Sequence, residues 1–127
     1  MKTNRQSLGR WGENFAANYL TELGYEILQQ NARTPYGEID LVARLAIDAE
    51  PLIVFVEVKT RSSSSFGLPE QSVSPRKQEH LLNSAQYYLQ EHPELGLDWR
   101  VDVIAILRLS GDRPPAITHF ENAVGSS

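Results

Sequence analysis

The sequence contains no cysteine, so disulfide scaffolds and thiolate metal sites are both excluded. It also has no apolar run that approaches the length of a membrane span. Residues 1–10 are polar and lack the apolar core of a signal peptide. These absences predict a cytoplasmic protein that does not associate with membranes.

Positive charge is in short supply, with 12 Lys and Arg against 16 Asp and Glu and a net charge of −4. A dedicated nucleic-acid-binding protein usually has a basic overall balance, so the total argues against that class. It does not exclude a nuclease, because a metal site needs clustered carboxylates and only one face must be positive to meet phosphates. The positions of the charges therefore matter more than their sum.

The length of 127 residues suits one domain over residues 1–127, and the 41% of apolar residues can form a hydrophobic core. Apolar residues at helical spacing predict a first helix over residues 8–23, which Gly24 ends. Three strand-like segments follow, at residues 25–33, 37–44 and 52–61. The third of them is apolar on both faces before Glu57, which is typical of a central strand.

The second half of the chain predicts a loop, a helix and one or two strands. Residues 62–69 are rich in Ser, Gly and Pro and predict a mobile loop. Ser74 is a good N-cap and Pro75 suits the first helical position, so a second helix begins there and ends at His92. Two apolar segments follow, a buried strand at residues 101–107 and a short edge strand at residues 116–120. The predicted order αβββαβ, with a possible extra edge strand, indicates an α/β fold with a mixed sheet flanked by helices.

Charged residues alternate along two of these strands, which places Glu38 and Asp40 on one face of the second, and Glu57, Lys59 and Arg61 on one face of the third. A hairpin centred between Asp48 and Ala49 brings Asp40 opposite Glu57. Directly opposed residues have Cβ atoms roughly 4.5–5.5 Å apart, which lets both carboxylates hold one cation. A register slip of one residue would destroy this pairing.

Two facing carboxylates repel each other unless positive charge lies between them. A hard divalent ion such as Mg²⁺ or Mn²⁺ suits Asp40 and Glu57, and the Val58 carbonyl would supply a third oxygen. Lys59 would then lie where its ammonium can orient a water molecule or stabilise charge on a phosphate. We therefore predict a metal site for phosphodiester hydrolysis.

A simpler interpretation makes these residues the solvated face of a two-stranded ribbon. Glu57 and Lys59 would then form a surface ion pair worth less than about 1 kcal/mol. The buried character of the third strand favours the metal site, because charged residues in such strands usually have a partner or a function.

The residues Asp40 and Glu57-Val58-Lys59 resemble the PD-(D/E)xK nuclease signature, with Glu38-Ile39-Asp40 in place of its Pro-Asp. More narrowly, the chain resembles the YraN-like family of bacterial predicted endonucleases. The matching segments are residues 9–13, 37–41, 54–61, 74–77, 100–105 and 117–123. The resemblance implies a restriction-endonuclease-like fold, similar to that of archaeal Holliday junction resolvases. It also implies a metal-dependent endonuclease that acts on DNA, with branched or repair intermediates as the substrates to test.

By the same resemblance, Glu13 corresponds to a helix-borne acidic residue that completes many such catalytic sites. The helix dipole also favours a glutamate in a first turn, so both interpretations stay open. Four basic residues that flank the motifs are expected to contact nucleic acid: Arg10, Arg61, Arg76 and Lys77.

The remaining polar and aromatic residues predict structural roles. A buried Asp102 must find a partner, and Arg100 and Arg10 are the candidates. Three aromatic residues, Trp11, Tyr19 and Tyr88, are expected in the core, and no role is assigned to His80, His92 or His119.

Three functions remain in competition. The leading one is the endonuclease, and the intact set of Asp40, Glu57 and Lys59 favours it over an inactive nucleic-acid-binding module. The acidic net charge favours a protein-interaction domain instead. The sequence leaves DNA versus RNA open, and it leaves the oligomeric state open, with a homodimer among the options.

Overall fold

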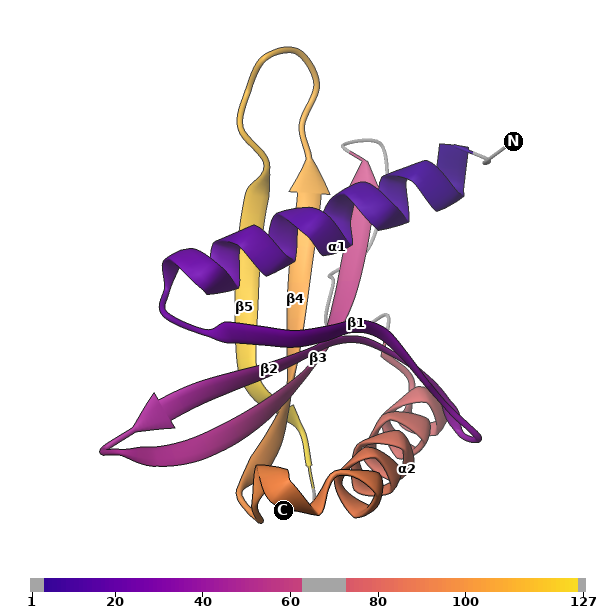
Figure 1. The fold of residues 1–127 in the computed structure, drawn as a ribbon. Helices are drawn as coiled ribbons and strands as arrows, with labels where there is room; N and C mark the ends of the chain where they lie inside the picture. The colour runs from indigo at the N-terminus through magenta and orange to yellow at the C-terminus, as the bar shows by residue number, and fades with distance from the viewer. Residues whose placement is uncertain (1–3, 63–72, 126–127) are drawn as a thin grey trace.

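The computed structural model describes residues 4–62 and 73–125, which form a five-stranded sheet with two α-helices against it (Figure 1). The helices are α1 (Asn4–Glu22), α2 (Pro75–Glu91) and the short 3-10 helix η2 (Pro93–Leu95). The strands are β1 (Glu26–Thr34), β2 (Gly37–Ile47), β3 (Glu50–Ser62), β4 (Trp99–Arg108) and β5 (Ala116–Val124). The predicted element order is confirmed, and the extra edge strand is present and longer than predicted.

The strands lie side by side in sequence order, with β3 in the middle of the sheet. The β3–β4 pair is parallel, and the other three pairs are antiparallel. This mixed α/β architecture is the predicted fold class and is consistent with a restriction-endonuclease-like fold. The central position of β3 also agrees with its continuous apolar sequence.

The ends of the helices and the β2–β3 turn follow from local sequence. Gly24 has φ 99° after α1, and the Tyr25 N–H bonds the Leu20 carbonyl, which together end the helix in a Schellman motif. Ser74 caps α2 by accepting the Lys77 N–H, as predicted. Asp48 and Ala49 both have positive φ, as a two-residue type I′ hairpin turn requires, which confirms the predicted centre of the hairpin.

Of the predicted loop at residues 62–69, Ser62 is the last residue of β3, and residues 63–69 lie outside the described residues. Among the residues that the structure describes, no helix is both long enough and apolar enough to cross a membrane.

A hydrophobic core lies on each face of the sheet. The core under α1 joins Ala16 and Leu20 to the inward side chains of β3 and β4. The core under α2 joins Leu81 and Tyr88 to the opposite face of the same strands. The predicted core aromatics are found there, with Tyr88 buried in the α2 core and Trp11 and Tyr19 partly buried against the α1 core.

The β2 strand separates from β3 partway along the sheet. The β2–β3 pairs end at Leu41 and Val56, whereas β2 stays paired with β1 as far as Gly37, and β3 stays paired with β4 as far as Ser62. We call this divergence the fork. Figure 1 shows its result: the β1–β2 hairpin bends toward α2, and β3 continues beneath α1. Asn31, with φ 56°, lies opposite Asp40 at the bend.

Candidate metal centre

Asp40 lies at the fork, one residue beyond the last β2–β3 pair. Its Oδ2 atom accepts the backbone N–H of Val58 at 2.8 Å. The Asp40 carboxylate thus accepts a β3 N–H that a backbone carbonyl of β2 would accept if the β2–β3 ladder continued. In an extended strand the N–H and C=O of one residue point to the same side, so the Val58 carbonyl also faces the fork.

Glu57 faces Asp40 across the fork, at the position that the confirmed hairpin register predicts. Its side chain is only 5% exposed. Burial raises the pKa of Asp40 to about 8, together with the charge of Glu57 and a hydrogen bond between the two carboxyl groups. The Val58 N–H acts in the opposite direction. At neutral pH the metal-free pair therefore holds a proton, because no basic side chain among the causes of the Asp40 shift offsets the burial of Asp40 and the charge of Glu57.

Two lysines approach the pair from the side of Glu57. The Nζ atom of Lys59 lies 3.5 Å from Glu57 Oε2, and that of Lys77, in the first turn of α2, lies 3.3 Å from the same oxygen. Lys59 is the predicted catalytic lysine. Lys77 was predicted as a nucleic-acid contact, and the structure adds its ion pair with a candidate metal ligand.

Glu13 reaches the site from α1, on the other side of the fork. The helix approaches β3 so closely that a Cβ atom at Gly12 would overlap the side chain of Thr60. Burial and the charges of Glu38 and Glu57 raise the pKa of Glu13, while a hydrogen bond with Asn31 opposes the rise. Glu13 is therefore close enough to affect the carboxylate pair electrostatically.

The structure does not join Glu13 to the pair as a third ligand. Within residues 4–62 and 73–125, no three His, Cys, Asp or Glu side chains form a group that could hold a metal ion. The candidate donor set is thus two carboxylates, Asp40 and Glu57, with the Val58 carbonyl beside them.

These residues line a cavity of about 560 Å³ that opens at the fork. Its lining comes from α1, β2, β3 and α2: Leu8, Gly9, Glu13, Asp40, Glu57, Val58, Lys59, Thr60, Arg61, Ser62 and Lys77. Of the four predicted nucleic-acid contacts, Arg61 and Lys77 line the cavity. Arg10 and Arg76 are exposed and lie outside the described lining.

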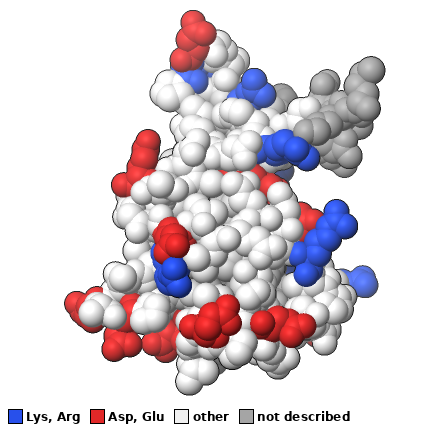
Figure 2. All heavy atoms as spheres, in the orientation of Figure 1, with Lys and Arg blue, Asp and Glu red and all other residues white. Residues whose placement is uncertain are grey.

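Basic side chains gather at this side of the molecule despite the acidic total. Figure 2 shows a hollow with Lys and Arg on its rims and acidic atoms within it, while Asp and Glu dominate the opposite lower edge. The cavity-lining residues include three bases, Lys59, Arg61 and Lys77. A phosphate chain could therefore approach the carboxylate pair between positive groups.

A second buried acid lies elsewhere in the sheet, on β4. Asp102 is fully buried and accepts hydrogen bonds from Arg100 Nε at 2.9 Å, from the Asn122 N–H at 2.8 Å and from His119 Nε2 at 2.7 Å. Burial alone would raise the pKa of Asp102, but these bonds lower it below its ordinary value. Of the two predicted partners, Arg100 is confirmed. Arg10 is not among the partners of Asp102.

His119, for which the sequence predicts no role, lies in this Asp102 cluster. The signal was available in outline, because an aspartate within an apolar strand needs donors and β5 is the next strand along the chain. Two irregularities in β5 make it impossible to predict from alternation which β5 residue lies beside Asp102. The β4–β5 register shifts between Val101 and Val103, and Asn122 has φ 50°.

Fold and site together define a class: a small α/β protein with paired carboxylates and a lysine at the point where its central strands diverge. Residues 12–106 match the family described as Uncharacterised protein family UPF0102. The chain belongs to the UPF0102 family, which is the YraN-like family that its motifs indicated. The matched span contains Glu13, Asp40, Glu57 and Lys59 but not His119.

Relatives match over nearly the whole chain. A UPF0102 protein of Syntrophotalea carbinolica is 46% identical over 123 residues, which cover 97% of this chain and 95% of the relative. Another from Dehalococcoides mccartyi is 42% identical over 125 residues, with 98% of each covered. A third, from Syntrophomonas wolfei, is 46% identical over 94% of this chain and 98% of its own.

Proposed function

We propose that the protein is a Mg²⁺- or Mn²⁺-dependent endonuclease that hydrolyses phosphodiester bonds in DNA. The observation that supports this most is the pairing of Asp40 with Glu57 at the fork, inside a cavity with a lysine at its edge. A buried pair that holds a proton at neutral pH is costly, and proteins keep such pairs where charge is needed for function. Branched and recombination or repair intermediates are the substrates we would test first.

The residues present fit a hard divalent ion. Asp40 and Glu57 would hold it, with the Val58 carbonyl as a third oxygen, and oxygen donors are the ligands such ions prefer. When bound, the ion supplies Lewis-acid polarisation of phosphate oxygens and lowers the pKa of a nearby water molecule. The proton held by the metal-free pair would leave on binding, so affinity should rise with pH toward about 8.

The basic groups of the chain would act on the phosphate. The Lys59 ammonium can orient the attacking water or stabilise the charge that develops on the phosphate oxygens. Lys77 and Arg61 line the same cavity and would hold the flanking phosphates. Glu13, with its raised pKa, lies on the opposite wall, where it could exchange a proton with water.

The test is cleavage by purified protein of labelled branched, duplex and single-stranded DNA, and of RNA, with Mg²⁺ or Mn²⁺. Wild type should cut at least one DNA substrate. Asp40→Asn should abolish cleavage and weaken metal binding, because an amide keeps one oxygen but loses the charge. Lys59→Ala should reduce the rate by at least about 100-fold while Mn²⁺ binding, followed by calorimetry, stays within about twofold.

Asp48→Asn is the matched control for these variants. It makes the same chemical change at the far turn of the same hairpin, at a positive φ that asparagine tolerates. It should leave both activity and metal binding unchanged. If wild type binds nucleic acid but cleaves none of these substrates with either metal, the inactive binding module becomes the better description. If it neither binds nor cleaves, the search moves to a protein partner.

A further inference from the structure

The tip of the β1–β2 hairpin carries an exposed aromatic side chain beside the fork. Tyr36 is 49% exposed, and it is the one aromatic among the exposed large hydrophobic residues of the described chain. Its ring makes a T-shaped contact with the Tyr87 ring on α2, with centroids 6.5 Å apart at an interplanar angle of 67°. Single exposed hydrophobic residues are common, so exposure alone does not indicate a function for Tyr36. The hydrogen bonds that hold its turn and its place beside the fork are the evidence that does.

The turn that presents Tyr36 is held by a cluster of hydrogen bonds. The Thr34 Oγ1 atom accepts the Tyr36 N–H at 3.1 Å and lies 2.7 Å from the Gly37 carbonyl. The same oxygen lies 2.9 Å from Ser84 Oγ, which fastens the tip to α2. Tyr36 is thus presented on a preorganised turn, so less conformational entropy would be lost when a ligand binds to it.

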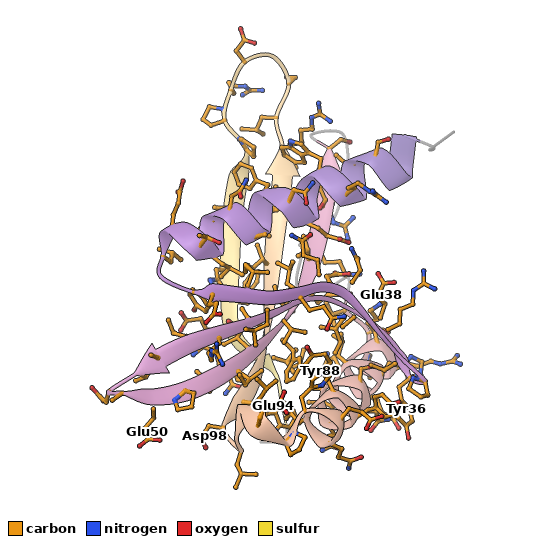
Figure 3. All side chains as sticks on the ribbon, viewed as in Figure 1. Tyr36, Glu38, Glu50, Tyr88, Glu94 and Asp98 are labelled. Atoms are coloured by element: carbon orange, nitrogen blue, oxygen red, sulfur yellow. The ribbon has the colours of Figure 1, made fainter. Side chains whose placement is uncertain are left out.

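Its position relates it directly to the fork. Tyr36 lies in the β1–β2 turn, four residues before Asp40. An extended chain of that length spans at most about 13 Å, or about four stacked nucleotides. On α2, Lys77 contacts Glu57 at one end and Tyr87 contacts Tyr36 nearer the other, with Ser84 between them. Figure 3 shows Tyr36 at the tip beside α2 and Glu38 farther up the hairpin toward the fork.

The chemistry of the tip suits an unpaired nucleotide. An aromatic face next to positive charge is the usual way to bind single strands, because every base offers a π face. Arg33 supplies a cation here, with a side chain 91% exposed and 3.8 Å from Glu38. A base inside a duplex is already stacked on both sides and has no free face to offer.

We propose that Tyr36, backed by Tyr87, is a stacking subsite for an unpaired nucleotide of the DNA strand whose phosphate lies at the fork. This inference rests on the proposed function, since it takes the fork as the place where the strand is held. A subsite of this kind implies that the substrate is a duplex that continues into unpaired nucleotides, and not a fully paired duplex.

The test measures affinity by fluorescence anisotropy in EDTA, so cleavage plays no part. The probes are a duplex of two separate strands with a six-deoxyuridine single-stranded tail, the same duplex with blunt ends, and the duplex with a six-uridine RNA tail. Tyr36→Ala should weaken binding of a tailed probe by about tenfold, and Tyr36→Phe by less than about twofold. Affinity for the blunt duplex should not change. The DNA and RNA tails show which sugar the subsite accepts: Tyr36 dependence with the DNA tail supports the proposal, and dependence confined to the RNA tail would overturn its assignment to DNA.

The matched control is Leu97→Ala, because Leu97 is 93% exposed and lies outside the cavity lining of the described residues. It should bind every probe as wild type does. An equal loss on tailed and blunt probes, no loss in Tyr36→Ala, or no binding by wild type would each overturn the subsite. Tyr36-dependent binding without any cleavage in metal would instead refute the nuclease and leave the subsite standing.

Discussion

Two buried aspartates on one sheet have opposite electrostatic environments. Asp102 accepts bonds from Arg100, His119 and the Asn122 backbone, and its pKa falls below the ordinary value. Asp40 has one backbone donor and faces another carboxyl group, and its pKa rises to about 8. The first is fully satisfied by the protein, which is the sign of a structural role. The second has no basic partner of its own among the described residues, which makes the fork a candidate ligand site.

Topology explains why the two differ. The Asp102 cluster forms where β4 and β5 stay paired on both sides of a bulge, so the neighbouring strand brings donors to the carboxylate. At the fork the neighbouring strand leaves, and the space that opens admits solvent instead of donors. The two lysines there approach Glu57, the other member of the pair.

The largest expected difference between the two aspartates is in how stability responds to pH. Folded metal-free protein holds a proton on Asp40 that the unfolded chain, with an ordinary pKa of 3.8, releases. Raising the pH from about 4 to about 8 should therefore lower the free energy of unfolding, by at most about 1.4 kcal/mol per pH unit. Urea unfolding in EDTA across this range measures the slope.

Asp40→Asn is the control for that slope, since an amide does not titrate, and its profile should be flatter. Asp102 should act with the opposite sign. Its lowered pKa adds stability above the unfolded value of 3.8, which is lost as the pH falls through the lower folded value. Parallel pH profiles for wild type and Asp40→Asn would show that the carboxyl pair holds no proton.

A direct comparison of stability at pH 7 should also separate the two sites. Asp102→Asn removes the charge that Arg100 and His119 bind inside the protein, and we expect a loss of about 3 kcal/mol in the free energy of unfolding. Asp40→Asn should cost nothing or stabilise the metal-free protein, because the amide is neutral without having to take up a proton on folding and can still donate a hydrogen bond to Glu57. Chemical denaturation of both variants measures this, and an equal loss in the two would make the fork a structural ion cluster.

The smallest effect is expected at His119. His119→Ala should cost about 2 kcal/mol, less than Asp102→Asn, because Arg100 and the Asn122 N–H still satisfy the carboxylate. His119→Gln should recover part of the loss, since its amide can donate to the same oxygen. Thermal denaturation measures the order of the three variants. Mn²⁺ binding at the fork should be unchanged in both His119 variants.

Much of this arrangement could be predicted from local sequence. Periodicity identified α1 and α2, and Ser74 with Pro75 gave the start of α2. Alternation around Asp48 and Ala49 gave the β2–β3 register, and with it the opposition of Asp40 and Glu57. These features depend on contacts between residues close in the chain, which a sequence pattern records.

The fork itself could not be predicted, because alternation describes a strand and not where its neighbour leaves. The contact of Lys77 with Glu57 depends on how α2 packs on the sheet, and the close approach of Gly12 to Thr60 depends on the packing of α1. Arg10 and Arg76 were expected at the site because they adjoin its motifs in the sequence. Both are exposed and outside the cavity lining of the described residues.

The single parallel ladder of the sheet has a consequence for how the chain folds. Asp40 and Val58 are 18 residues apart, and Asp102 and His119 are 17 apart, so each aspartate finds its partner within a local hairpin. The β3–β4 ladder pairs Val56 with Asp102 and must close a far longer stretch of chain through α2. Closing such loops dominates contact order and slows folding. Kinetically, each acidic site belongs to a fast local element, and joining them into one sheet is the slow, nonlocal step.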